Sequence, residues 1–109
     1  YFGGLVRPAL DGNVHAARAL HRVYRDGFGH AADPTLAWAW IRWAHEACLP
    51  RPGEPEVEEA APVQEDYELA LDSIAPAVRN EGDAALAAIL AEHGSPLLAA
   101  AGGSVQLFA

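Results

Sequence analysis

Apolar and small residues recur at helical spacing along residues 12–48, in two stretches separated by a glycine-containing turn. Residues three and four positions apart are neighbours on a helix, so each stretch presents one apolar face. The two faces consist of Ala16, Leu20 and Tyr24, and of Ala37, Trp40 and Ala44. This pattern predicts two amphipathic helices that pack against each other as an antiparallel hairpin.

Residues with known preferences for helix ends mark the boundaries of both helices. Asn13 is placed to cap the start of the first helix, and Gly27 or Gly29 can take the left-handed conformation that ends it. Asp33 is placed to cap the second helix. Pro34 would then occupy its first turn, where a backbone N–H has no partner to lose.

The order of these residues resembles the Sel-one-like repeat family, a branch of the tetratricopeptide superfamily of helix-turn-helix solenoids. The match is carried by Ala16, Leu20, Tyr24, Gly27, Gly29, Asp33, Ala37, Trp40 and Ala44. Three histidines depart from the family pattern: His21 replaces a glycine, His30 an apolar residue and His45 an alanine. Because His21 is bulky, we expect a less close contact between the two helices than glycine allows.

The resemblance implies a fold and a kind of function. The fold would be all-α, an α-α solenoid of antiparallel helix hairpins. Residues 12–48 would form one clear repeat unit within a single domain that covers residues 1–109. The function would be adaptor or scaffold work in a bacterium, and some proteins of this kind are immunity proteins that neutralise a toxin.

Residues 49–64 interrupt the helical pattern. Between Leu49 and Pro62 the chain contains four prolines and four glutamates, too polar a composition to bury much apolar surface. We predict an acidic, proline-rich loop here, with at most one helical turn at Pro55–Ala61. A regular array would place a helix at this point, so the repeat is interrupted or degenerate.

Helical spacing returns in residues 65–101, which we interpret as a degenerate second half. A helix is predicted over Asp66–Asn80, kinked or split in two by Pro76. Its inward face would consist of Leu69, Ala70, Ile74, Ala77 and Val78. A further helix over Asp83–His93 would bury Leu86, Ile89 and Leu90.

Weaker signals complete the pattern along the chain. The pair Gly82-Asp83 is interpreted as a cap that lies 70 residues after Gly12-Asn13, about twice the tetratricopeptide period. A preceding helix is expected to end near Leu5–Leu10, and a short one to follow Ser95, before a tail at residues 102–109. Since repeat units need neighbours and the chain begins at Tyr1 without any methionine, we expect a piece of a longer protein.

Charge is divided unevenly along the 109 residues, which carry a formal net charge of −8. Residues 1–51 contain six arginines and four acids, whereas residues 52–109 contain eleven acids and only Arg79. This distribution argues against nucleic acid as a partner, since phosphate contacts need a basic surface. No apolar run approaches the roughly 20 residues that span a bilayer, so we expect a soluble domain without membrane contact. The single cysteine, Cys48, leaves the compartment open.

A stripe of basic residues lies opposite the apolar face of the first helix. It consists of His15, Arg18, Arg22 and Arg25. In line, three guanidiniums could bind carboxylates of a partner, with Tyr24 at the edge of the groove. Two other interpretations stay open: an ordinary solvated helix face, or pairing with the acidic segment Glu54–Glu59 of the same chain.

The three tryptophans fall on different faces of the second helix. Trp40 and Trp43 lie on its inner face and are assigned to the core, whereas Trp38 is displaced toward Arg42 and His45. Trp38 is therefore either a contact between helices or an exposed anchor for a partner, since tryptophan is enriched at binding hot spots. On the second interpretation Trp38 and Arg42 join the candidate binding residues.

Chemistry of other kinds has little support in the sequence. His21, His45 and Cys48 are ligand types that suit zinc, but no fourth ligand stands at a recognised spacing, so no metal site is predicted. No nucleophile elbow, phosphate-binding glycine loop or paired-histidine zinc motif occurs. We therefore predict neither a cofactor nor an enzyme.

The sequence thus predicts a helical-repeat module that binds another protein. The candidate binding residues are Arg18, Arg22, Tyr24, Arg25, Trp38 and Arg42. The acidic second half would suit a basic partner, such as a toxin or effector. The alternative is a structural helical subdomain of a larger protein or assembly, without a binding role of its own.

Overall fold

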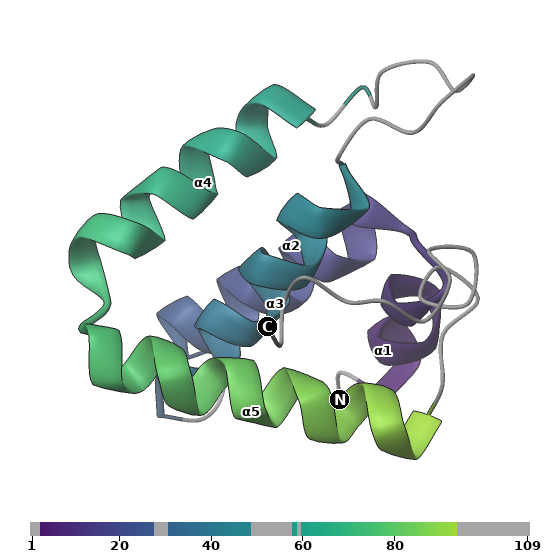
Figure 1. The fold of residues 1–109 in the computed structure, drawn as a ribbon. Coiled ribbons are helices and arrows are strands. Elements are labelled where there is room, and N and C mark those ends of the chain that lie inside the picture. The colour runs from purple at the N-terminus through teal and green to yellow at the C-terminus, as the bar shows by residue number, and fades with distance from the viewer. Residues whose placement is uncertain (1–2, 28–30, 49–57, 59, 94–109) are drawn as a thin grey trace.

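The computed structural model describes residues 3–27, 31–48, 58 and 60–93, which contain five helices (Figure 1). They are α1 (Gly3–Leu10), α2 (Val14–Asp26), α3 (Pro34–Ala47), α4 (Ala60–Ser73) and α5 (Pro76–His93). The predicted all-α class is confirmed, since these residues form no strand. Within the same ranges, no helix combines the length and apolar character that crossing a membrane requires.

The hairpin of α2 and α3 begins and ends where its capping residues predicted. The Asn13 side chain accepts a hydrogen bond from the N–H of Ala16 at 3.1 Å, and Asp33 caps α3 by accepting from the N–H of Leu36 at 3.1 Å. Gly27 adopts the left-handed conformation with φ 74° and ends α2. These caps are local interactions, which is why the sequence alone located them. Gly29 and His30 lie outside the described residues.

Helix α3 forms the centre of the fold. It contacts α2, α4 and α5, while α1 packs on α2 (Figure 1). Because other helices cover it on several sides, eight of the fourteen residues of α3 are buried. They are Ala37, Trp38, Ala39, Trp40, Ile41, Trp43, Ala44 and Ala47.

Two tryptophans of α3 belong to the core, as expected. Trp40 and Trp43 are each 2% exposed, and the indole N–H of Trp43 donates to the backbone oxygen of Ala9 at 2.7 Å. This hydrogen bond satisfies the indole N–H, which would otherwise be buried without a partner, and it connects the end of α1 to α3.

The boundaries of α4 correct two predictions. Helix α4 already begins at Ala60, so the loop assigned to residues 49–64 extends too far. Pro62 is compatible with a helix because it occupies the first turn, where proline removes no needed donor. Of the two alternatives for Pro76, a split is observed, because α4 ends at Ser73 and α5 starts at Pro76.

Burial along this half agrees with the predicted inward faces only in part. Ala70, Leu86 and Leu90 are buried and Ile74, Val78 and Ile89 are partly buried, but Leu69 and Ala77 are exposed. The expected helix after Ser95 and the tail at residues 102–109 lie outside the described residues. So do residues 49–57 and Glu59 of the predicted acidic loop.

Gly82 does not cap a helix, which corrects a further prediction. Helix α5 runs without interruption from Pro76 to His93, with Gly82 near its middle. A Cβ atom on Gly82 would lie 2.6 Å from Cδ1 of Trp38 and 2.7 Å from the backbone oxygen of Thr35. The glycine is needed for the close approach of α5 to α3, so its pairing with Gly12 as a repeat marker is wrong.

Candidate functional site

Contacts within the chain divide the arginine stripe of α2 into two parts. Nε of Arg18 donates to Oδ2 of Asp66 on α4 at 2.8 Å, and the Asp66 side chain is only 9% exposed. A carboxylate this buried needs a charged or hydrogen-bonding partner, so Arg18 holds α4 against α2. The stripe therefore does pair within the chain, but with Asp66 of α4. The alternative of pairing with Glu54–Glu59 lies outside the described residues, except for Glu58.

Arg22 and Arg25 remain near the surface. Nε of Arg22 is 3.9 Å from Oδ2 of Asp66, its one ionic contact within the described ranges, and its side chain is 49% exposed. Arg25 donates through Nε and Nη2 to the two oxygens of Asp26, at 2.9 and 3.0 Å. These bonds raise the pKa of Arg25 and lower the pKa of Asp26, so both groups stay charged near neutral pH. Donors of both arginines therefore remain open to solvent or to a partner.

A cavity of about 260 Å³ is lined by Arg25, though not by Arg22, and lies between α2, the start of α3 and the part of α4 from Asp66 onward. Its apolar walls are formed by Pro34, Ala37, Leu69, Ala70 and Ile74. The Leu69 side chain is unusual, because it is a large apolar residue that is 59% exposed. The wall is thus an apolar surface that the described part of the chain leaves uncovered.

The polar edge of the cavity comes from His21, Arg25 and Asp66. Nδ1 of His21 lies 2.8 Å from the backbone oxygen of Ala37. Since a carbonyl oxygen only accepts, Nδ1 carries the proton and Nε2 keeps its lone pair. Burial lowers the pKa of His21, while the Ala37 hydrogen bond and the charge of Asp66 partly oppose that shift. The imidazole is therefore neutral near pH 7, and the cavity has an uncharged wall at this point.

His21 lies within the contact between α2 and α3. It is 2% exposed and bonded to α3, so the bulky ring is part of the contact rather than a spacer. His45 instead stacks on Tyr67 of α4, with ring centroids 4.0 Å apart. The part of the chain that the structure describes contains no group of three side chains placed to hold a metal ion.

Of the two interpretations of Trp38, the contact between helices is observed, so Trp38 is not an exposed anchor and does not belong to a binding surface. It is 1% exposed, and its indole N–H donates to Oδ1 of Asp83 on α5 at 2.9 Å. Its ring stacks with Tyr67 of α4 at a centroid distance of 5.4 Å, and the Arg79 guanidinium lies 5.7 Å from it. Trp38 is therefore the point where α3, α4 and α5 meet.

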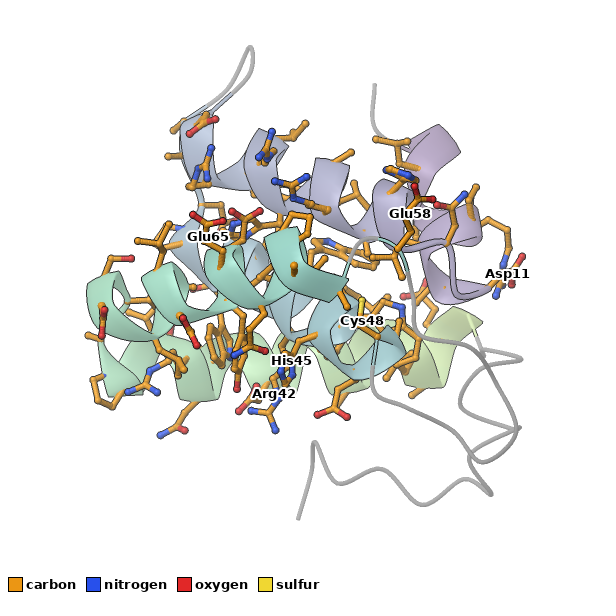
Figure 2. The ribbon with its side chains drawn as sticks, turned by 90° about the horizontal axis from the view of Figure 1, so that it is seen from above. Asp11, Arg42, His45, Cys48, Glu58 and Glu65 are labelled. Carbon is orange, nitrogen blue, oxygen red and sulfur yellow. The ribbon has the colours of Figure 1, made fainter. Side chains whose placement is uncertain are left out.

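Arg42 lies with Trp38 rather than with the stripe of α2. Its Nη1 is 3.5 Å from Oδ1 of Asp83, its Nε is 3.9 Å from Glu46, and its side chain is 20% exposed. Figure 2 shows Arg42 beside His45 and well separated from Glu65 of α4. The acids of α5 and α3 thus occupy Arg42, and the structure does not bring it to the cavity.

Tyr24 is half-buried and packs in part against the hydrophobic core. The sequence did not single out Asp66 or the cavity itself. Leu69 was expected to face inward, and its helical spacing gave no sign that it would stay uncovered. Only the position of α4 across α2, a contact distant in sequence, brings Asp66 and Leu69 to the arginine stripe.

Comparison with known proteins adds no relative: no family model, no curated protein sequence and no solved structure matches this chain.

Proposed function

We propose that this protein is a helical interaction module that binds a protein partner across the face shared by α2 and α4. The observation that carries the proposal is an apolar cavity lined by the exposed Leu69 and the half-exposed Arg25, with the half-exposed Arg22 near Asp66 of the same lining. An apolar anchor pocket beside arginines is typical of binding hot spots, whose energy concentrates in a few side chains.

The size of the cavity favours a protein over a small organic ligand. Sites for drug-sized molecules usually enclose about 300 to 1,000 Å³. The cavity here, about 260 Å³, is better matched to one or two side chains that project from a larger surface. A partner would also cover the outer part of Leu69, which a small ligand inside the cavity would leave in water.

The adaptor or scaffold work implied by the Sel-one-like resemblance agrees with this proposal, and no catalytic step is part of it. The arrangement of α2 and α3 as a hairpin is compatible with a helical repeat, although the described helices gather around α3. The narrower hypothesis, an immunity protein against a basic toxin, would use another surface: the exposed acids of α4, such as Glu65, Glu68 and Asp72.

Charge reversal on the stripe tests the proposal. The double variant Arg22→Glu/Arg25→Glu should lose the partner that the full chain captures from lysate while it still folds cooperatively, because Arg18 keeps its 2.8 Å bond to the buried Asp66 and the Arg22 contact is 3.9 Å long. Arg7→Glu is the matched control, since Arg7 is a 49% exposed arginine of α1. Equal capture by all three proteins would contradict a binding role for the stripe.

The alternative, a structural subdomain that depends on a larger protein, has a separate test. The chain alone should sediment as one species and melt cooperatively if it is an independent module. An aggregated or non-cooperative chain would support the structural alternative. A requirement for Glu65, Glu68 and Asp72 instead of the arginines would support the immunity hypothesis.

A further inference from the structure

The residues that line the cavity between α2, α3 and α4 indicate which side chains of a partner fit there, a point that the proposed function leaves open. We propose that it binds a short partner segment in which a large apolar side chain is followed or preceded, within a few residues, by a carboxylate. The apolar side chain enters the cavity, and the carboxylate binds Arg22 and Arg25. This inference rests on the proposed function and specifies the partner for that same site.

The cavity walls indicate that the side chain entering the cavity is apolar. Ala37 and Ala70 are small and buried, and Leu69 and Ile74 border the opening with side chains that remain exposed or half-buried. An apolar cavity of about 150 Å³ already accepts benzene, and this one measures about 260 Å³. Leucine, isoleucine or phenylalanine would therefore fit. A charged side chain would have to lose its hydration against these walls, at a cost that only pairing could offset.

The carboxylate of the partner segment is inferred from the ion pairs that the arginines of α2 already form within the chain. Asp66 is occupied by Arg18 at 2.8 Å, so it offers little to a second cation. Asp26 occupies Nε and Nη2 of Arg25, which leaves Nη1. The Arg22 guanidinium has only its 3.9 Å contact with Asp66. Three guanidiniums thus face two carboxylates, and the open donors suit a planar, bidentate acceptor.

The sign of this local charge is opposite to that of the whole chain. A net charge of −8 would attract basic partners at long range. Beside the cavity, however, a lysine or arginine of a partner would meet Arg22 and Arg25 at short range. The site therefore selects an acidic segment against the overall electrostatic trend.

Selection from a random peptide library displayed on phage, with the full chain as bait, tests the proposal. The enriched peptides should combine Leu, Ile or Phe with a nearby Asp or Glu, and the best of them can be synthesised for affinity measurements by fluorescence polarisation. Replacement of the peptide's acid by its amide should weaken binding about tenfold, the loss expected for one charge-assisted hydrogen bond. The same replacement should have a smaller effect on binding to the Arg22→Gln protein, which lacks the charge that pairs with the peptide's acid.

Two leucines of α4 provide the matched variants for the apolar contact. Leu69→Asp should weaken peptide binding at least about tenfold, because it puts a charge on the cavity wall beside the incoming side chain. Leu71→Asp makes the same change on the same helix at a residue that is 37% exposed and does not line the cavity, and it should leave affinity unchanged. Ser73→Leu, which fills the exposed edge, should also weaken binding.

The outcomes separate this inference from the proposed function. Basic peptides, or acidic peptides whose affinity is indifferent to Leu69→Asp, would overturn the inference while leaving a binding role for the arginines. Failure of the library to yield any peptide that Leu69→Asp weakens would also overturn it. Loss of both peptide selection and partner capture would contradict the proposed function as well.

Discussion

The two sides of helix α3 are built differently. On the side of α5, Gly82 lets two helix backbones approach closely, Trp38 is completely buried, and its N–H is bonded to Asp83. On the side of α2 and the second half of α4, a cavity remains and Leu69 lies 59% exposed. Close packing of this kind stabilises a fold, whereas an uncovered apolar wall does not. We infer that the α3–α5 contact serves stability, whereas the α2–α4 face serves binding.

Helix α4 takes part in both regions, and the change occurs along its length. In the part of α4 up to Tyr67, Val63 is fully buried, Tyr67 stacks on Trp38 and His45, and Gln64 bonds to Nε2 of His45 at 3.0 Å. In its second half Leu69 and Ser73 are exposed at the cavity. The part of α4 that packs on α3 positions the part that lines the cavity. The cavity wall is therefore held in place by contacts outside the cavity.

The largest effect on stability is expected from Trp38→Ala. Removal of a buried tryptophan leaves a cavity and takes from Asp83 its 2.9 Å donor, so that only the longer contact with Arg42 remains, and the free energy of unfolding should fall by about 4 kcal/mol. Urea denaturation followed by circular dichroism measures this loss. If the alanine variant does not fold, Trp38→Phe, which retains an aromatic ring but loses the donor, should give a smaller measurable loss. A loss below about 1 kcal/mol for Trp38→Ala would contradict the assigned role of this contact.

A second test of the α3–α5 contact is Gly82→Ala. The added methyl group would meet a backbone oxygen and the Trp38 ring at distances that no real Cβ adopts, and the helices must separate. We expect a net destabilisation of about 2 kcal/mol, although alanine is the better helix former. Gly4→Ala is the control, because nothing lies within 4 Å of a Cβ there. It should be neutral or stabilising, and equal effects of the two substitutions would refute the close approach at Gly82.

The ion pair between α2 and α4 should give a smaller effect. Asp66→Asn keeps the shape of the side chain but removes the charge that pairs with Arg18. A hydrogen bond to a charged group contributes about 1.5 to 3 kcal/mol, and a loss near the lower figure is expected because Asn retains one acceptor. In thermal melts, Asp72→Asn serves as an exposed control on the same helix. The assignment fails if Asp66→Asn is as harmless as the control.

The pH dependence of stability should reveal His21. Its pKa is lowered in the folded chain, chiefly by burial, so the unfolded chain binds the proton first as pH falls. The contribution of neutral His21 is fully present above about pH 6.5, the ordinary histidine value, and is lost as pH falls through the lower folded pKa. Denaturation at several pH values should therefore give a shallower decline for His21→Asn than for the unchanged chain. Parallel declines would mean that His21 titrates normally.

The sequence predicted the parts of the fold that depend on neighbouring residues. Asn13, Gly27 and Asp33 act within one helical turn of their own positions, and their roles were correctly assigned. The start of α4 at Ala60 was missed, because composition around Pro62 indicated a loop while the position of that proline in the first turn was compatible with a helix.

The candidate site was predictable only as far as its arginines. Their helical spacing placed Arg18, Arg22 and Arg25 on one stripe, but pairing of Arg18 with Asp66 spans 48 positions and follows from tertiary packing. The role of Gly82 also follows from tertiary packing. Its residue type suggested a helix cap, but in the structure it allows α5 to approach Trp38 of α3. Spacing along one helix gave no information on which residues another helix covers.

Hydrogen exchange of the full chain, with and without the strongest selected peptide, tests the difference between the two sides of α3 most directly. Bound peptide should slow amide exchange in residues 21–26 of α2 and 66–73 of α4, and should leave α5 unchanged. The free chain should exchange more slowly in α3 and α5 than in the second half of α4. New protection confined to α5, with none in α2 or α4, would contradict the assignment of binding to the α2–α4 face.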